Sequence, residues 1–439
     1  MPPTITPWGL GMRGNNSWAE GERPKSWLET LLYNWPNGDM PLTGMTSKLG
    51  TKTVDDHEFN WWEKGLPTQS GDCVLYEDLA LSNAFTTTTN VVVVGDPFYA
   101  KVALKVAKEF RPGHTVALRD ANDASISINA KVVSINYNGD SSSIGLIARE
   151  ATTGDVLEDV DLIQVIGNAN PQGGAIPQVV SYQPTKINNF TQIFWTPYQI
   201  TNTAKATRLR TKEAEMELKR EALQLHGIEM ERALIWGKRY EGIGDNGEPE
   251  TETMGLVQFI NEYAKDNVFD YTGESSTDYL NKGWTTAGSR WLNEKLEILF
   301  RYGGDTKLLV CGSGALLGIN RLAETFGQIN ISPGQTKFGI SVREWETPFG
   351  VILLKTHPLF SQTTVDRYRM VAIEPGNIKR RPIKGRDTRF YPDSTTMESS
   401  VTKVDAVKPS FLTEVGFELH HASHMAIFDG VGQNNGSGT

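Results

Sequence analysis

Two glycine-rich stretches are the first parts of this sequence whose residue types and spacing could do chemistry. Residues 242–247 (GIGDNG) and 312–318 (GSGALLG) space glycines as in turns whose backbone amides cradle a dinucleotide pyrophosphate. Such a turn must join a strand to a helix. The first stretch follows a long helical pattern instead. The second lies between a strand and a helix, but residues 331–335 offer no Asp or Glu to bind a ribose. We therefore interpret both stretches as structural turns.

Three histidines, His420, His421 and His424, form the cluster that could bind a metal. Two histidines at positions i and i+4 of a helix can share a zinc ion. Residues 415–419 alternate as in a strand, however, so we favour surface or interface histidines. The sequence has no P-loop, no Gly-x-Ser-x-Gly elbow and no Cys–His nucleophile spacing. We predict no catalytic residue, no cofactor and no metal site, and a protein that is not an enzyme.

The main basic cluster lies between residues 379 and 389 and could contact nucleic acid through charge alone. Pro382, Gly385 and Asp387 interrupt it, so a loop that makes salt bridges to an acidic neighbour is an equal alternative, and a merely solvated loop is the third. The net charge of −9 argues against a dedicated reader of DNA sequence. The members of the cluster are Lys379, Arg380, Arg381, Lys384, Arg386 and Arg389.

The bulk composition is that of a globular protein with a sizeable core. The 439 residues allow two or three domains, and the 22% of charged and 38% of hydrophobic residues are ordinary values. No apolar run reaches the roughly 18 residues that span a bilayer, and the N-terminus lacks the pattern of a signal peptide. Two cysteines, Cys73 and Cys311, fit a reducing compartment without a disulfide framework. We predict no membrane contact.

Residues 1–85 are predicted to form an N-terminal arm. Glycine and proline recur between its tryptophans, and so irregular a segment cannot bury them by itself. We expect these side chains to make intersubunit contacts by packing on neighbouring copies, with a strap packed on its own domain as the alternative. The tryptophans of the arm are Trp8, Trp18, Trp27, Trp35, Trp61 and Trp62.

Residues 86–200 are predicted to form a β-rich module that protrudes or resembles a barrel. Residues 126–132 and 133–137 alternate in opposite registers, which predicts a β-bulge between them. Asn138-Gly139 predicts a hairpin turn, because both residues tolerate positive φ. Residues 144–148 alternate again on the return strand, and residues 100–110 have a short helical pattern.

A long helix is predicted over residues 203–238, with a length of about 50 Å at roughly 1.5 Å per residue. Thr201, Asn202 or Thr203 can cap it, and Glu215 and Lys219 have a favourable i,i+4 spacing. Two apolar stripes predict burial on more than one side, although the central helix of an ordinary α+β domain shows the same periodicity. One stripe is Ala214, Leu218, Ala222, Leu225, Ile228 and Ile235, and the other is Met216, Leu223, Met230 and Leu234.

Residues 263–400 are predicted to alternate helix and strand. The expected helices are 292–302 and 315–326, and the expected strands are 307–311, 341–345, 351–355 and 368–373. Residues 411–428 add one or two strands, and the Gly/Asn/Ser-rich tail 432–439 is expected to be flexible.

The order of these segments resembles that of the major capsid proteins of tailed bacteriophages. The likeness is to the branch with a β-rich elongated loop before a long spine helix, and it covers about residues 40–430. Its motifs are FNWWE (59–63), VVSIN (132–136), IGNA (166–169), NFTQIF (189–194), IEMERALIWGK (228–238) and TMGL (253–256). LLV (308–310), TPFG (347–350) and EVGFEL (414–419) fit more loosely.

The resemblance implies an α+β fold, the tailed-phage major capsid fold. It has an N-terminal arm at 1–85, an elongated β-hairpin loop within 86–200, a peripheral domain with the spine helix at 201–262, an axial domain at 263–400, and returning strands with a C-terminal tail at 401–439.

The function that the resemblance implies is self-assembly, through hexamers and pentamers, into an icosahedral shell around a double-stranded DNA genome. The implied location is the virion capsid, after assembly in the host cytoplasm. The implied partners are other copies of the chain, a portal, scaffolding or decoration proteins, and packaged DNA through non-specific contact. The alternatives are the shell of a cellular nanocompartment and a β-rich glycan-binding module.

Overall fold

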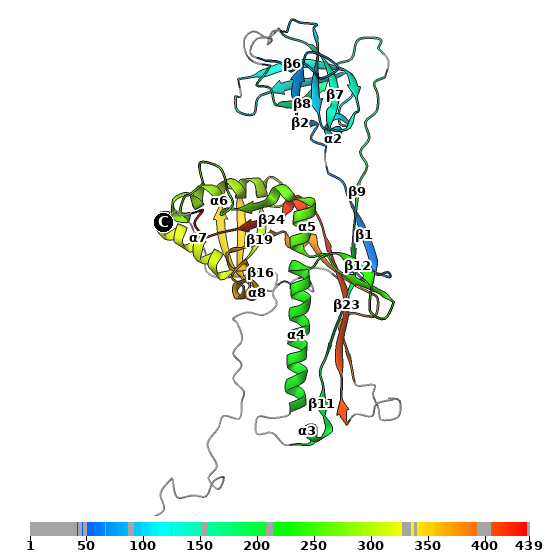
Figure 1. The fold of residues 1–439 in the computed structure, drawn as a ribbon, viewed down its shortest axis with the longest axis vertical. Helices are drawn as coiled ribbons and strands as arrows, with labels where there is room; N and C mark the ends of the chain where they lie inside the picture. The colour runs from blue at the N-terminus through cyan, green and yellow to red at the C-terminus, as the bar shows by residue number, and fades with distance from the viewer. Residues whose placement is uncertain are drawn as a thin grey trace, which may run out of the picture. The chain divides into compact units, whose positions relative to one another are not determined.

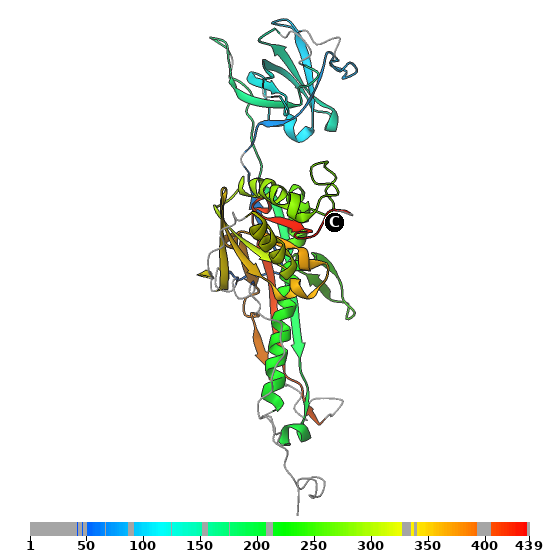
Figure 2. The same ribbon diagram turned by 90° about the vertical axis from the view of Figure 1, so that its left-hand side faces the viewer.

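The computed structural model describes Leu42, Thr46 and residues 51–65, 67–86, 92–123, 125–151, 157–174, 176–207, 214–326, 335–337, 340–392 and 405–436. The chain divides into two compact units (Figures 1 and 2). Unit 2 is Trp62–Lys186, and unit 1 combines the chain up to Trp61 with Ile187–Thr439. The chain enters unit 2 along β1 (Glu58–Glu63) and returns along β9 (Thr185–Phe190), and these two strands pair. The fold is mixed α+β, as predicted.

Unit 2 is an antiparallel sheet that closes on itself. Its seven strands follow the order β2-β8-β5-β6-β7-β4-β3. Only Cys73 separates the two strands at the ends of that order, so one chain segment holds both edges and completes a barrel. The strands are β2 (Ser70–Asp72), β3 (Val74–Tyr76), β4 (Pro97–Val102), β5 (His114–Arg119), β6 (Ser127–Asn136), β7 (Ser142–Ala148) and β8 (Leu162–Asn168).

The predicted β-bulge is present in this barrel. The pairing of β6 with β7 shifts register between Val132 and Ser134, and Val133 is exposed. The hairpin predicted at Asn138-Gly139 is present, because β6 and β7 pair antiparallel on either side of it and Gly139 has a φ of +53°. Asn138 does not adopt a positive φ but keeps −142°, and a 3-10 turn (Gly139–Ser141) lengthens the loop.

The helical pattern over residues 100–110 is only partly realised. The strand β4 extends to Val102, and a short helix, α2 (Leu104–Ala107), follows it. Pairing of β4 with its neighbour β7 gives the first residues of this pattern an extended conformation.

The larger sheet of unit 1 has seven strands in the order β14-β24-β19-β15-β18-β17-β16. Pairs β15–β18 and β14–β24 are parallel, and the other neighbours are antiparallel. The strands are β14 (Val268–Asp270), β15 (Thr306–Cys311), β16 (Gln335–Lys337), β17 (Ile340–Thr347), β18 (Gly350–Thr356), β19 (Met370–Ile373) and β24 (Ala426–Asp429).

Helices cover both faces of this sheet, because its central strands are apolar on both sides. Leu308 and Val310 of β15 pack in one cluster with the end of α4 (Ala214–Trp236) and with α5 (Leu256–Tyr263). Leu309 and Cys311 pack in a second cluster with α6 (Trp284–Phe300) and α7 (Ser313–Phe326). The strands and helices predicted for residues 263–400 are therefore present. The first helix begins at Trp284 rather than 292, because Trp284 and Trp291 lie on its buried face.

A second, four-stranded sheet supports α4. The central strand β23 (Ser410–Leu419) is buried along its whole length. The strand β10 (Gln192–Pro197) pairs with one edge of β23, and β20 (Ile378–Pro382) and β21 (Arg389–Tyr391) pair in succession with the other. Phe194, Met230 and Val415 join α4 to this sheet. Smaller elements are β11 (Ile200–Thr201) paired with β22 (Ala406–Val407), the hairpin of β12 (Tyr240–Ile243) and β13 (Pro249–Glu252), and α3 (Asn202–Ala206) and α8 (Pro358–Gln362).

The described part of the predicted long helix consists of α3 and α4. The Thr201 hydroxyl caps α3 by accepting a hydrogen bond of 3.2 Å from the Ala204 amide. The expected Glu215–Lys219 pair is wrong. Lys205 of α3 approaches Glu215 to 2.9 Å, and the Lys219 ammonium lies 3.9 Å from the ring centroid of Phe390. Partners from other elements displace the i,i+4 contact.

Candidate functional site

The two glycine-rich stretches are structural turns, as predicted. Residues 242–247 form the end of the β12–β13 hairpin, where the Gly244 amide donates to the Glu248 carbonyl at 2.8 Å. Residues 312–318 join β15 to α7. A Cβ atom at Gly312 would lie 2.3 Å from the Arg367 carbonyl oxygen, and one at Gly318 would lie 2.5 Å from the Cα of Gly432. Close packing explains these glycines.

The histidine cluster is bound up in contacts within the chain. His420 contacts Glu418 at 2.5 Å, and the His421 and His424 rings stack with centroids 4.9 Å apart. His424 Nδ1 lies 3.0 Å from Glu374 Oε2. Over the residues that the structure describes, no three His, Cys, Asp or Glu side chains converge as metal ligands.

A buried lysine completes the polar network beside these histidines. Lys307 is fully buried, and its ammonium donates to Glu374 Oε2 at 3.1 Å and to the backbone oxygens of Tyr302 and His424 at 3.0 and 3.2 Å. Burial lowers the pKa of Lys307. Burial opposes ionisation of Glu374, but the hydrogen bond from Lys307 holds the pKa of Glu374 below its usual value. Every group has a partner, so the network is structural.

Three members of the basic cluster are neutralised within the chain. Each of these arginines contacts a carboxylate from its own loop or from β23. The pairs are Arg380–Asp387 at 2.7 Å, Arg381–Glu418, and Arg386–Glu414 at 2.5 Å.

Lys379, Lys384 and Arg389 differ from these arginines. Among the described residues, no side chain forms an ion pair with any of the three. Lys379 lies on β20 and is half-buried, whereas Lys384 and Arg389 are exposed. Within the basic cluster, the positive charge available to a partner is therefore that of these three side chains.

The two tryptophans of the predicted arm that the structure describes have opposite environments. Trp61 is buried, with its ring centroid 6.2 Å from Phe59 and 6.1 Å from His420. Trp62 is 61% exposed. Trp8, Trp18, Trp27 and Trp35 lie outside the described residues.

A buried carboxylate on α4 was not singled out by the sequence analysis. Glu231 is fully buried, and its Oε1 accepts from the Leu42 amide at 2.9 Å and lies 2.8 Å from His357 Nε2. His357 in turn caps α8 through the Leu359 amide. The available signal was the spacing of Glu231, which lies three residues after Ile228 and four before Ile235 and therefore on the helix face of that apolar stripe. This carboxylate ties the predicted arm at Leu42 to the long helix.

The second apolar stripe of α4 is divided between the core and the surface. Met230 and Leu234 are buried, whereas Met216 is 67% and Leu223 is 48% exposed. Leu225, from the first stripe, is 52% exposed. Exposed apolar side chains on one long helix suit a protein contact better than a chemical reaction.

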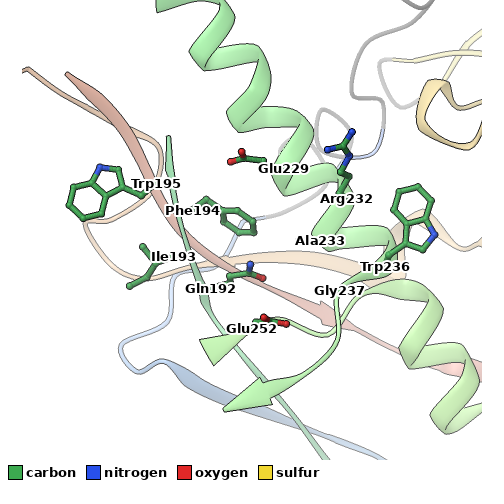
Figure 3. Close-up of a pocket in the computed structure, with 10 residues that line it drawn as sticks. All are labelled: Gln192, Ile193, Phe194, Trp195, Glu229, Arg232, Ala233, Trp236, Gly237 and Glu252. Atoms are coloured by element: carbon green, nitrogen blue, oxygen red, sulfur yellow. The ribbon is translucent and has the colours of Figure 1, made fainter. Parts of the chain in front are cut away.

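An open groove runs between the C-terminal half of α4 and β10 (Figure 3). Its volume is about 490 Å³. Phe194 points toward α4, and Trp195 points away from it and is 65% exposed. The lining residues are Gln192, Ile193, Phe194, Trp195, Glu229, Arg232, Ala233, Trp236, Gly237 and Glu252. No pair of these lining residues is poised as a nucleophile and base.

Two further properties of the described residues concern membrane-spanning segments and thiol reactivity. No helix among them is long and apolar enough to cross a membrane. Burial raises the pKa of both the Cys73 and the Cys311 thiols to about 12, so neither is a reactive thiolate.

Comparison with known proteins relates this chain to a protein family, a relative in sequence and solved structures. The family model described as SU10 major capsid protein matches residues 15–432. The major capsid protein of Pseudomonas phage PaMx41 is 24% identical over 421 residues, which cover 93% of this chain and 92% of that protein. A solved chain of Mycobacterium phage Bobi has 7% identity and a TM-score of 0.43, covering 93% of this chain and 95% of that one. For a chain of Mycobacterium phage Adephagia the identity is 8% and the TM-score 0.42, with coverages of 93% and 94%.

Proposed function

Because this chain belongs to the SU10 major capsid protein family, we propose that it is the structural subunit of a bacteriophage capsid. It self-assembles through hexamers and pentamers into an icosahedral shell around a double-stranded DNA genome. The observation that carries this function is the family match over residues 15–432, which spans both units. The subunit acts in the virion capsid after assembly in the host cytoplasm, and its role is structural rather than enzymatic.

Exposed apolar side chains support a subunit that other copies cover. Met216, Leu223 and Leu225 on α4 and Ile193 and Trp195 on β10 belong to unit 1, and all are about half exposed or more. In this proposal α4 is the spine helix of the peripheral domain at 201–262. The barrel of unit 2 is the elongated-loop region; its strands β2 and β3 lie in the expected arm at 1–85, so the region begins before the expected bounds of 86–200. The seven-stranded sheet belongs to the axial domain at 263–400, apart from its strand β24.

The N-terminal arm at 1–85 and the segment 401–439 have separate roles in this scheme. The contacts of Leu42 and Trp61 anchor the arm to its own unit, and the exposed Trp62 is free to meet a neighbouring subunit. We assign Trp8, Trp18, Trp27 and Trp35 to the same intersubunit contacts. The strand β23, within 401–439, returns to the sheet beneath α4.

The partners in this proposal are other copies, a portal, scaffolding or decoration proteins, and packaged DNA. The three unpaired cations, Lys379, Lys384 and Arg389, are the surface of the basic cluster available to DNA or to a neighbouring subunit. Arg380, Arg381 and Arg386 form ion pairs within the chain beside that surface.

Electron microscopy of the purified protein, with size-exclusion chromatography, tests the function. Closed icosahedral shells, or rings of five and six subunits, are the expected result. A protein that stays monomeric or dimeric, even when its neighbouring gene products are co-expressed, would contradict the proposed function.

The content of the shells separates the capsid from the nanocompartment alternative. Shells isolated from infected cells should contain double-stranded DNA. Shells that contain only protein cargo would favour the nanocompartment. A small particle that binds glycans through its exposed tryptophans would favour the glycan-binding module.

A further inference from the structure

The β12–β13 hairpin carries charge of one sign. Residues 240–252 contain no Lys or Arg, and all of their carboxylates lie on exposed residues. These acidic residues are Glu241, Asp245, Glu248, Glu250 and Glu252. Glu241 lies 3.9 Å from His57 Nε2, and over the described residues the other four carboxylates have no ion-pair partner. Tyr240 and Ile243 add apolar surface, with exposures of 53% and 80%.

This acidic hairpin is fixed to one edge of the four-stranded sheet. The Thr251 hydroxyl donates to the Thr191 carbonyl at 2.6 Å, and the Thr253 amide donates to Gln192 Oε1 at 3.3 Å. Both contacts lie at β10 or immediately before it. These two hydrogen bonds therefore fix the base of the hairpin at the β10 edge of the sheet.

The three unpaired cations lie at the other edge of the same sheet. Lys379 is on β20 and Arg389 on β21, and both strands pair with the side of β23 opposite β10. Lys384 lies in the loop between them, where its amide donates to the Val54 carbonyl at 3.0 Å. One sheet thus carries unpaired negative charge at one edge and unpaired positive charge at the other.

We propose that the acidic hairpin of one copy docks on Lys379, Lys384 and Arg389 of a second copy. This inference rests on the proposed function and names one of its intersubunit contacts. A contact between different surfaces of identical subunits is head-to-tail, and such contacts close into rings when the rotation between subunits permits. Rings of five and six subunits require a repeated contact of this kind.

Charge in this contact directs the geometry of association. Complementary charges raise the association rate and suppress wrong orientations more than they add affinity. Exposed ion pairs are also screened by salt, with a Debye length of about 8 Å at physiological ionic strength. The exposed Tyr240 and Ile243 supply the apolar area that the charges cannot.

Nucleic acid is the other polyanion that could occupy the basic surface. Three of the six cations in the cluster are already neutralised by Asp387, Glu414 and Glu418. A chain with a net charge of −9 also repels phosphate overall. A small acidic hairpin matches three localised cations better than a continuous phosphate backbone does.

Reciprocal charge reversal in the full chain tests the inference. The acidic set is Asp245→Lys, Glu248→Lys and Glu250→Lys, and the basic set is Lys379→Glu, Lys384→Glu and Arg389→Glu. A third variant combines both sets. A matched control reverses three exposed carboxylates elsewhere in unit 1, Asp266→Lys, Asp305→Lys and Glu324→Lys. Sedimentation and electron microscopy measure the assembled fraction, and circular dichroism checks folding.

We expect each single set to lower the assembled fraction at least tenfold, and the combined variant to recover most of it. The control should assemble like the parent chain. Unchanged assembly in either single set, or no recovery in the combined variant, would overturn the contact. Intact shells with a reduced DNA content in the basic set would instead assign this surface to nucleic acid. Shell formation by the parent chain tests the proposed function independently of every variant.

Discussion

The barrel of unit 2 and the α4 layer of unit 1 bury their residues in different ways. The barrel encloses one apolar cluster, with residues such as Ala130, Ile144 and Leu146 almost completely buried. The α4 layer is joined by buried polar groups, including His226 and Glu231, and leaves Leu223 exposed. The barrel core is one apolar cluster, whereas the α4 layer combines apolar packing with buried polar contacts to the elements beneath it.

Buried hydrogen bonds of His226, called here the polar joint, hold α4 in one position on the sheet beneath it. His226 Nδ1 lies 2.9 Å from Thr196 Oγ1 on β10, and His226 Nε2 lies 2.7 Å from Thr413 Oγ1 on β23. Apolar packing tolerates small shifts, but hydrogen bonds of this kind fix the helix in one register. In the proposed capsid subunit, such a fixed inner face would hold the outer face of α4 in one orientation.

Removal of the Glu231 carboxylate should produce the largest loss. Glu231→Ala leaves the Leu42 amide and His357 Nε2 without their buried partner. We expect the free energy of unfolding of unit 1 to fall by about 3 kcal/mol or more. Hydrogen–deuterium exchange read by mass spectrometry should show faster exchange in α4 and α8, with the barrel peptides unchanged.

The matched control for this change is Glu221→Ala on the same helix. Glu221 is half-buried, and no side chain among the described residues forms an ion pair with it. Its replacement should change stability by about 0.5 kcal/mol or less. Equal effects of the two substitutions would show that the contacts of Glu231 with Leu42 and His357 do not stabilise unit 1.

The barrel should respond to cavity formation instead. Leu146 is 1% exposed and belongs to the barrel core. Leu146→Ala should lower the stability of unit 2 by about 2–4 kcal/mol, through lost burial and the cavity that remains. Val133→Ala, at the exposed bulge, is the control and should have almost no effect. Faster exchange in the peptides of unit 1 would contradict the separation of the two units.

Acid should weaken the polar joint more than the apolar contacts around it. Burial, aided by the charge of Arg380, lowers the pKa of His226, and nearby Glu229 opposes this. The unfolded chain then binds a proton below about pH 6.5 that the folded chain does not, so stability falls as the pH drops. The contribution of this one histidine is at most about 1.4 kcal/mol for each pH unit.

The variant His226→Gln separates this contribution from those of other histidines. Burial also lowers the pKa of His114 in unit 2 and of His424 in unit 1. Thermal unfolding between pH 7 and pH 5 should show a shallower acid slope for unit 1 in the variant, while the slope for unit 2 is retained. An unchanged slope for unit 1 would assign its acid sensitivity elsewhere.

The same contrast explains what the sequence could predict. Alternation and its register shift locate the bulge at Val133, because local sterics and side-chain burial set a strand's pattern. The long helix and the strand at Thr306–Cys311 follow for the same reason. The end-to-end pairing of β20 and β21 along β23 could not be predicted, since periodicity says nothing about which distant strands meet.

The candidate surface shows the same limit of sequence reasoning. The basic cluster is visible as a run of charge, but its division into paired and unpaired cations depends on Glu414 and Glu418 of β23. The buried Glu231–His357 contact joins residues from separate elements. Both features are products of tertiary contacts.

The smallest effect should come from the surface of the α4 layer. The Lys219 ammonium lies 3.9 Å from the Phe390 ring centroid, a cation–π contact between α4 and β21. Lys219→Gln should lower the stability of unit 1 by roughly 0.5 kcal/mol, because such contacts are weak at exposed positions. Lys219→Arg keeps the cation and should restore most of this loss in chemical denaturation. If both variants lose stability equally, the contact depends on the shape of the lysine rather than its charge. The contact between α4 and β21 would then be stabilised chiefly by packing, as the interior of the barrel is.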